Sequence, residues 1–331
     1  MKSLPLVLFV AGCASAATAP REEVVAVPGT DLRLEMVYVP GTATVRPFWI
    51  SKREVTWGEF DRFYQSPEEQ KIDGITRPSS GKNYLQLSGL PAESMDEGRP
   101  VTNLRFHSAI SYCEWLSRKT GMIFRLPTER EWEASPGRAT IWEYCLESER
   151  PPDFGPVLRG DGRRTIPPEW DEADPNRPVS TWWFRTGHSQ GFRVVRVPGV
   201  SATTPTVEIS ALKGEERTVR TGRSIALYMR VTGEVRNVGA RAIDELMLKV
   251  YYLDPAGKPH FEDVTSNLTR RATFNVCLPA VRNSAHSGTH PLAPGERRAF
   301  AADLPLSMDA DADVQLEKFG ASVVHLRLAG D

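Results

Sequence analysis

Cys13 is the residue whose type and position point most directly to a covalent reaction. Lys2 gives the N-terminus a positive charge, and the apolar run after it is shorter than the roughly 20 residues that a membrane-spanning helix needs. Such a run is typical of a secretory signal that is cleaved off. It ends in Val10-Ala11-Gly12-Cys13, where small residues admit a signal peptidase and the thiol can take a diacylglycerol. We predict a lipoprotein signal peptide over residues 1–12 and a lipid on Cys13; the alternative is an ordinary signal cleaved near residues 14–17, which would discard Cys13.

A lipid on Cys13 would tether the folded chain to a membrane through a flexible segment, residues 13–24. Several acyl chains make such an anchor stable, because each buried methylene contributes about 0.8 kcal/mol. Ala14 does not resemble an inner-membrane retention signal, so we expect a bacterial cell-envelope location with the outer membrane preferred. The net charge of −1 leaves no basic footprint for nucleic acid. The expected partners are the membrane and an envelope protein or glycan.

Three thiols remain if Cys13 is acylated. Cys113, Cys145 and Cys277 are an odd number, so at most one intramolecular disulfide can form, and the sequence does not say which. Cys113 lies on the apolar face of a predicted helix, where a buried, inert thiol is the ordinary case. The candidate catalytic residues are those that one pocket could gather into an acid–base or nucleophilic set: Glu143, Cys145, Arg185 and His188.

Tryptophan residues supply a candidate ligand platform. Trp182 and Trp183 are adjacent, and Trp170 stands beside an acidic stretch that could bind a cation or a sugar. Core packing and a solvated loop are the alternatives for these two segments. His286 and His290 have a spacing that suits a metal on a helix, but the Gly and Pro residues around them argue against a helix there. We therefore predict no metal site.

The elements that must position these residues divide at a composition break, residues 198–205, which we predict to be a linker. Before it, residues 25–197 mix short strands with short helices. Thr56 and Thr128 each precede a Glu by three residues, the capping-box spacing that predicts a helix start. A further helix is predicted to begin at Ser108. Its apolar stripe consists of Ala109, Tyr112, Cys113 and Leu116, and it ends near Gly121.

After the break, apolar residues recur every second position. The alternating runs are Ile225, Leu227, Met229 and Val231; Leu246, Leu248, Val250 and Tyr252; and Val324, Leu326 and Leu328. Turn-forming segments separate them, such as Asp254-Pro255-Ala256-Gly257. Residues 206–331 are therefore predicted to form an antiparallel β-sandwich.

Several segments, in order, resemble the formylglycine-generating-enzyme (sulfatase-modifying-factor) family. They are Met36–Gly41, Phe48–Thr56, Pro100–Asn103, Arg125-Leu126-Pro127-Thr128-Glu129-Arg130-Glu131-Trp132-Glu133, Trp142-Glu143-Tyr144, Arg159-Gly160 and Gly191-Phe192-Arg193. The resemblance implies an α+β, loop-rich, C-type-lectin-like domain. The stretch Val231–Gly239 with the later turn Leu292–Glu296 is similar to bacterial Ig-like modules of the FxLYD type. Five residues within these segments are interpreted as scaffold, with Arg125 pairing with Glu131 or Glu133: Arg125, Glu131, Trp132, Glu133 and Arg193.

The resemblance also implies a copper-dependent oxidase that converts a substrate cysteine to formylglycine. Copper would be held by two cysteines between Arg159 and Gly191, and this stretch contains none. The family's calcium site would need an Asn and a longer segment ahead of Glu143, where Ala139-Thr140 stand instead. We therefore expect no cofactor and no copper, with calcium the alternative that stays open.

These observations favour an envelope lipoprotein whose family domain is a non-catalytic binding or assembly module. The alternative is an enzyme of the same superfamily with altered, non-copper chemistry on an unknown substrate.

Overall fold

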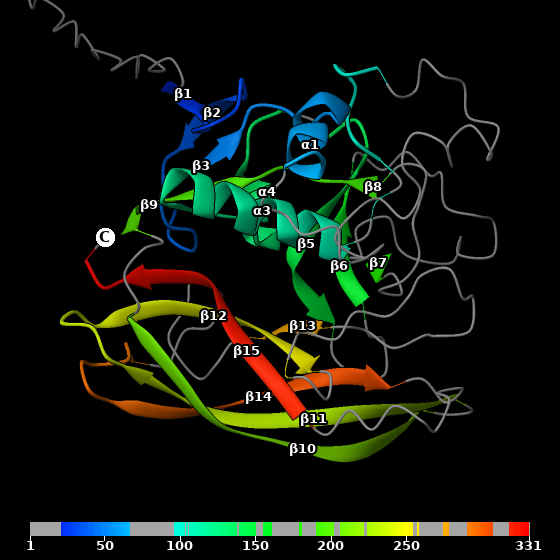
Figure 1. Ribbon diagram of the computed structural model, residues 1–331, viewed down its shortest axis with the longest axis vertical. Coiled ribbons are helices and arrows are strands. Elements are labelled where there is room, and N and C mark those ends of the chain that lie inside the picture. The colour runs from blue at the N-terminus through cyan, green and yellow to red at the C-terminus, as the bar shows by residue number, and fades with distance from the viewer. Residues whose placement is uncertain are drawn as a thin grey trace, which may run out of the picture.

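The computed structural model describes residues 21–66, 96–102, 104, 106–137, 139–149, 155–160, 179–180, 190–201, 206–221, 224–253, 257, 274–277, 290–306 and 318–330. We refer to the described residues up to 201 as the N-terminal module and to those from 206 onward as the β-module. Figure 1 shows the N-terminal module, with its helices, above the long strands of the β-module.

The N-terminal module contains two sheets. The five-stranded sheet has the order β1-β2-β3-β9-β4, formed by β1 (Glu22–Ala26), β2 (Arg33–Val39), β3 (Phe48–Ser51), β9 (Val195–Ser201) and β4 (Met122–Arg125). The four-stranded sheet has the order β7-β6-β5-β8, formed by β7 (Val179–Ser180), β6 (Gly155–Arg159), β5 (Trp142–Glu149) and β8 (Gln190–Gly191). Strand β9, the last of the module, pairs with both β3 and β4 and so joins them in one sheet. Strand β9 runs to Ser201 and so overlaps the predicted linker.

The helices α1 (Trp57–Tyr64), α3 (Phe106–Thr120) and α4 (Glu129–Ala134) begin near the predicted signals. The capping boxes at Thr56 and Thr128 are confirmed: each hydroxyl accepts the backbone N–H of the Glu three residues later, and that Glu accepts the backbone N–H of the Thr. The helix predicted from Ser108 begins two residues earlier, at Phe106. Its predicted apolar stripe is buried, and Gly121 follows its end with a φ of +70°.

The core of the N-terminal module is rich in aromatic rings. Five of them stack or meet edge to face across α1, α3 and the segment after β8: Phe60, Phe63, Tyr112, Trp115 and Phe192. Edge-to-face and offset pairs of this kind add specific geometry to apolar burial.

The β-module consists of antiparallel strands, as predicted from the two-residue period. One sheet has the order β10-β11-β14, formed by β10 (Val207–Thr221), β11 (Ser224–Asn237) and β14 (Arg297–Leu306). The other has the order β13-β12-β15, formed by β13 (Phe274–Cys277), β12 (Ile243–Leu253) and β15 (Lys318–Leu328). The core between the sheets includes Val231, Val235, Leu246, Leu248, Val250, Tyr252, Phe300 and Leu304.

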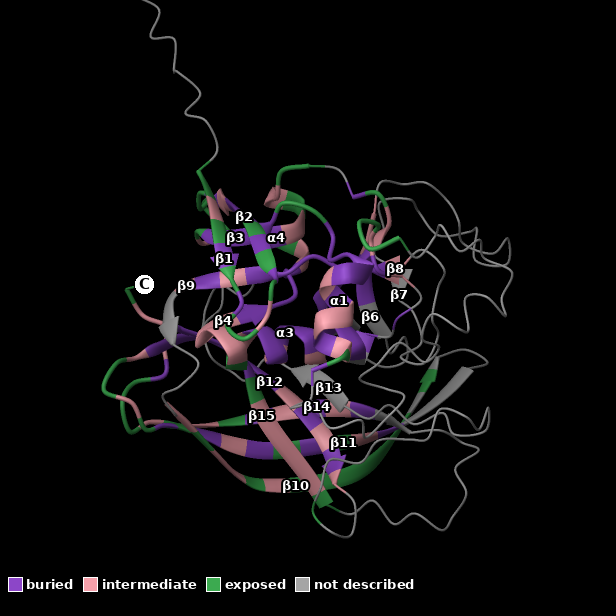
Figure 2. Ribbon diagram, turned by 45° about the horizontal axis from the view of Figure 1, so that its top comes forward, coloured by how far each residue is buried: buried purple, intermediate pink, exposed green. Residues whose placement is uncertain are grey.

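The sheet β13-β12-β15 is covered on both faces. One face packs on β10-β11-β14, and the other lies against the N-terminal module (Figures 1 and 2). Met247 and Val324 accordingly belong to the hydrophobic cluster of the N-terminal module. Between the apolar positions of β15, His325 and Arg327 are only 1% and 2% exposed. The alternating pattern in β15 would place these two residues on a solvated face, but the second layer buries them.

A β-bulge interrupts the pairing of β10 with β11. Ala211 and Leu212 together lie opposite Gly233, because Ser210 pairs with the residue after Gly233 and Lys213 with the residue before it. A Cβ on Gly233 would lie 2.8 Å from Leu212 Cδ2, so the absence of a side chain there gives the bulge its room. Ala211 takes a φ of +56°, a left-handed conformation that is strained for a residue with a Cβ.

Replacing Ala211 by Gly should therefore raise the free energy of unfolding by ~0.5–1 kcal/mol, since relief of the left-handed strain exceeds the entropy that Gly adds to the unfolded chain. The matched control is Ala299→Gly in β14, an equally exposed alanine with ordinary φ, which should lower that free energy by ~0.5–1 kcal/mol. Urea unfolding of both variants measures the difference. Equal destabilisation by the two substitutions would contradict strain at Ala211.

Candidate functional site

Glu143, one of the predicted catalytic candidates, lies at the start of β5 with no exposed surface. Its Oε2 accepts hydrogen bonds from Arg193 Nε and from Trp132 Nε1, both at 2.8 Å. Its Oε1 has no hydrogen-bond partner among the described residues. The parallel pairing of Glu143 with Gly191 brings Arg193 to this point. Arg193 and Trp132, interpreted from the sequence as scaffold, thus hold this carboxylate.

Gly191 has to be a glycine in this arrangement. A Cβ there would lie 2.5 Å from the backbone oxygen of Val101 and 2.3 Å from Ile141 Cδ1. The close approach lets β8 pair with β5 and places the following arginine beside Glu143. The Gly-Phe-Arg segment is therefore explained by packing.

A second buried carboxylate, Glu54, lies on the same polar cluster. It accepts the backbone N–H of Thr140 at 2.6 Å and the Thr140 hydroxyl at 2.8 Å. Burial raises the pKa of Glu143 to about 7, and the negative charge of Glu54 acts in the same direction. Arg193 and Trp132 oppose this shift but do not cancel it. Glu143 is therefore an acid that can exchange a proton near neutral pH.

Of the other predicted site residues, Cys145 lies among the residues that the structure describes, and the rest lie outside them. Cys145 is buried in β5, and like Cys113 in α3 it carries a thiol rather than a disulfide. Burial raises the pKa of the Cys113 thiol well above its ordinary value, which keeps it protonated and inert. The predicted residues that lie outside the described ones are Cys13, Trp170, Trp182, Trp183, Arg185 and His188.

A larger polar cluster begins at the end of β4. Arg125 makes two hydrogen bonds to Glu131, at 2.6 and 2.7 Å, and a third to the backbone oxygen of Leu126 at 3.0 Å. Of the two predicted partners, Glu131 is the one that pairs with Arg125, whereas Glu133 accepts a hydrogen bond from Arg159 at 2.8 Å. The capping box fixes Glu131 for this role, since its Oε2 also accepts the Thr128 backbone N–H.

Arg125 also reaches the β-module. Its Nε donates to Nδ1 of His325 in β15 at 3.0 Å, and Nε2 of His325 lies 3.0 Å from Oε2 of Glu245 in β12. A guanidinium has no acceptor, so Nδ1 must accept and Nε2 must carry the proton that is donated to Glu245. Burial, reinforced by the charge of Arg125, lowers the pKa of His325 to about 4 despite the neighbouring carboxylates. The imidazole is therefore neutral at pH 7.

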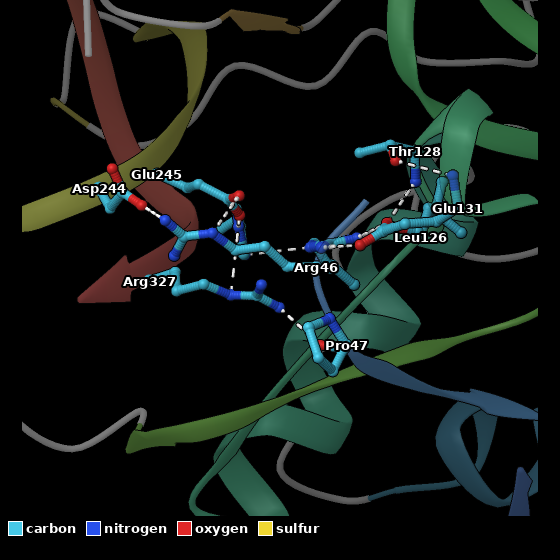
Figure 3. Close-up of polar contacts among 10 residues, drawn as sticks. Arg46, Pro47, Leu126, Thr128, Glu131, Asp244, Glu245 and Arg327 are labelled. Carbon is cyan, nitrogen blue, oxygen red and sulfur yellow. Dashed lines mark hydrogen bonds and ion pairs between the residues drawn. The ribbon is translucent and has the colours of Figure 1, made fainter. Parts of the chain in front are cut away.

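Glu245 connects His325 to two further arginines. Figure 3 shows Glu245 beside these arginines, Arg46 and Arg327. Arg327 Nε lies 3.8 Å and Arg46 Nε 3.7 Å from its carboxylate oxygens. Arg46 also pairs with Asp244, and Arg327 donates to the backbone oxygen of Pro47 at 3.1 Å. Burial alone would raise the pKa of Glu245, but His325 and the arginines hold it at about 2.

Sequence reasoning missed five residues of this cluster. One is Arg46, which precedes β3; the others belong to the β-module and are Asp244, Glu245, His325 and Arg327. The available signal was His325 and Arg327 between the apolar residues of one alternating run, and Asp244 and Glu245 just before another. These residues received no predicted role, because alternation in one strand does not reveal a second packed layer.

Residues 11–165 match the family model described as the sulfatase-modifying factor enzyme 1-like domain. The chain thus carries a domain of the formylglycine-generating-enzyme family, as its motifs indicated. A comparison with curated proteins gives no match. The structure adds β8 and β9, which follow the matched residues in sequence and pair with strands inside them.

The metals that the family resemblance implies can be tested against the donor atoms that are present. Calcium needs six to eight oxygen ligands. Glu143 instead receives a guanidinium and an indole N–H, and Glu54 receives donors from Thr140. Within the part of the chain that the structure describes, no three His, Cys, Asp or Glu side chains are grouped to hold a metal, and no helix is long and apolar enough to cross a membrane. The donors around Glu143 and Glu54 do not fit a calcium site. Cys113 and Cys145 are buried free thiols, one in α3 and the other in β5.

Glu143→Gln should change how stability depends on pH. The folded state holds the Glu143 proton up to about pH 7, whereas the unfolded chain releases it near 4.5, so this group favours folding less as pH rises from 4.5 to 7. Gln mimics the protonated form. From pH 5 to pH 8 the free energy of unfolding of the wild type should therefore fall by up to about 3 kcal/mol relative to that of the variant.

Urea unfolding at several pH values measures this difference. Glu133→Gln, at a half-exposed carboxyl on α4, is the control and should follow the wild-type profile. Parallel profiles for the wild type and Glu143→Gln would show that Glu143 does not titrate in this range.

Proposed function

We propose that this protein is a bacterial envelope lipoprotein whose formylglycine-generating-enzyme-type domain is a non-catalytic binding or assembly module. The observation that carries the proposal is the state of the thiols. Cu(I) in this family's reaction calls for two converging thiolates. Cys113 and Cys145 are buried in different elements, and the sequence from Arg159 to Gly191 contains no cysteine.

The use made of the family's signature residues supports the same proposal. Arg125 and Glu131 bond to each other, and Glu143 is held by Arg193 and Trp132. Each of these side chains is committed to internal contacts that organise loops and strands. A domain can keep such residues for its structure after its chemistry is lost.

The finer assignments belong to the proposal as well. They are a C-type-lectin-like fold for the N-terminal module, an Ig-like topology for the β-module, and a lipid on Cys13 that anchors both to the envelope membrane. The ligand would be an envelope protein or a glycan, with no copper, calcium or other cofactor. The β-module would act as a spacer or docking element.

One observation favours the alternative, an enzyme with altered, non-copper chemistry. Glu143 has a pKa of about 7 and an oxygen without a hydrogen-bond partner among the described residues, both of which suit general acid–base catalysis. Its complete burial counts against this role, because a substrate must reach the carboxylate. The non-catalytic reading therefore fits the geometry better.

A copper and peptide assay tests the proposal. The purified chain is titrated with Cu(I) against a competing chelator and then incubated aerobically with a cysteine-containing peptide of the sulfatase type. We expect no stoichiometric copper binding and no aldehyde on the peptide by mass spectrometry. An active family member in parallel controls the assay. One copper per chain together with aldehyde, both abolished by Cys145→Ser, would refute the proposal.

A further inference from the structure

The contact between the two modules includes an imidazole whose two nitrogens both make hydrogen bonds. His325 accepts from Arg125 on one side of the interface and donates to Glu245 on its own side. We propose that His325 is an acid-sensitive latch: a proton on Nδ1 breaks its hydrogen bond to Arg125 and loosens β15 from β4. This inference does not depend on the proposed function.

The geometry explains why protonation opens the contact. A second ring proton would sit on Nδ1 and face the N–H of Arg125 Nε, so that two donors and two positive charges meet where one hydrogen bond stood. Arg125 cannot turn away freely, since three other hydrogen bonds hold it to Glu131 and Leu126. The imidazole must therefore leave its position, or the interface must open.

Charged groups from several elements determine how readily His325 takes up a proton. Arg125 on β4 opposes a charge on the ring, whereas Glu245 on β12 and Glu131 on α4 favour it. Arg327 on β15 and Arg46 before β3 lie beside Glu245. Burial raises and the arginines lower the pKa of both carboxyls, and the net shift is downward in each case. Both carboxylates therefore stay charged in mild acid, and the imidazole is the member of the cluster that changes.

The direction of the pH effect follows from the two states of the ring. An exposed histidine takes its proton near pH 6.5, but docked His325 takes it only at about 4. Between these values the undocked state binds more protons, so acid favours undocking. The Lys249–Glu114 ion pair, at 2.6 Å, crosses the same interface without an imidazole. We accordingly expect a local loosening around His325 and not a separation of the modules.

Hydrogen exchange on the full chain tests the latch. Amide protection in β4 and β15 is followed from pH 7.5 to 4.5 and corrected for the intrinsic exchange rate. In the wild type, protection of these two strands should fall at least tenfold over this range. In His325→Asn, whose side-chain oxygen replaces Nδ1 as the acceptor for Arg125 but cannot titrate, protection should stay constant.

His290→Asn is the matched control, because His290 is an exposed histidine of the same module that pairs with Glu296. It should keep the wild-type response. Nitrogen NMR of the wild-type imidazole provides a readout that needs no variant: at pH 7.5 His325 should be neutral with its proton on Nε2. A cationic ring or an Nδ1–H tautomer at that pH would overturn the latch. So would unchanged protection in the wild type, or an equal loss in His325→Asn.

Discussion

The hydrogen bond from Arg125 to His325 joins residues 200 positions apart and is the central polar contact between the two modules. It lies in a row of polar groups, buried except for the partly exposed Arg46: Glu131, Arg125, His325, Glu245, and then Arg327 and Arg46. Removing such charges from water costs several kcal/mol per ion unless each finds a partner. Arg125 pairs with Glu131 and Arg327 with Glu245 within one module each, whereas Arg46 pairs with Asp244 and Glu245 across the interface. Docking therefore completes the buried row, which couples the docking of the modules to their folding.

The same reasoning gives the family's signature residues a structural role in this chain. Thr128 starts α4, the capping box orients Glu131, and Glu131 orients Arg125 toward the β-module. A substitution at any of these positions would disturb a helix start, a buried ion pair and the contact between modules together. Glu143 is a second such case, in which the guanidinium of Arg193 supplies the positive charge beside a buried carboxylate. Structural need is sufficient to account for both motifs.

Local features of this fold were predictable from the sequence. The capping boxes, the buried stripe of α3 and the antiparallel strands of the β-module depend on residues that are close in sequence, and their periods are visible in it. The sequence narrowed the partner of Arg125 to Glu131 or Glu133, and the structure selects Glu131. By contrast, His325 gives no local signal. A single histidine in an alternating strand indicates a solvated face until a second layer is known to cover it, and only the packing of sheet β13-β12-β15 between two neighbours supplies that layer.

The central claim is that the buried row makes the two modules one cooperative unit, and equilibrium unfolding in urea tests it most directly. All eight tryptophans precede residue 184, so tryptophan fluorescence follows the first half of the chain, whereas pulsed hydrogen exchange of peptides from β10, β11, β12 and β14 follows the β-module. A single cooperative unit requires the two probes to give superimposable transitions with one midpoint. Two separate midpoints at neutral pH would show that the modules fold independently and that the buried row does not couple them.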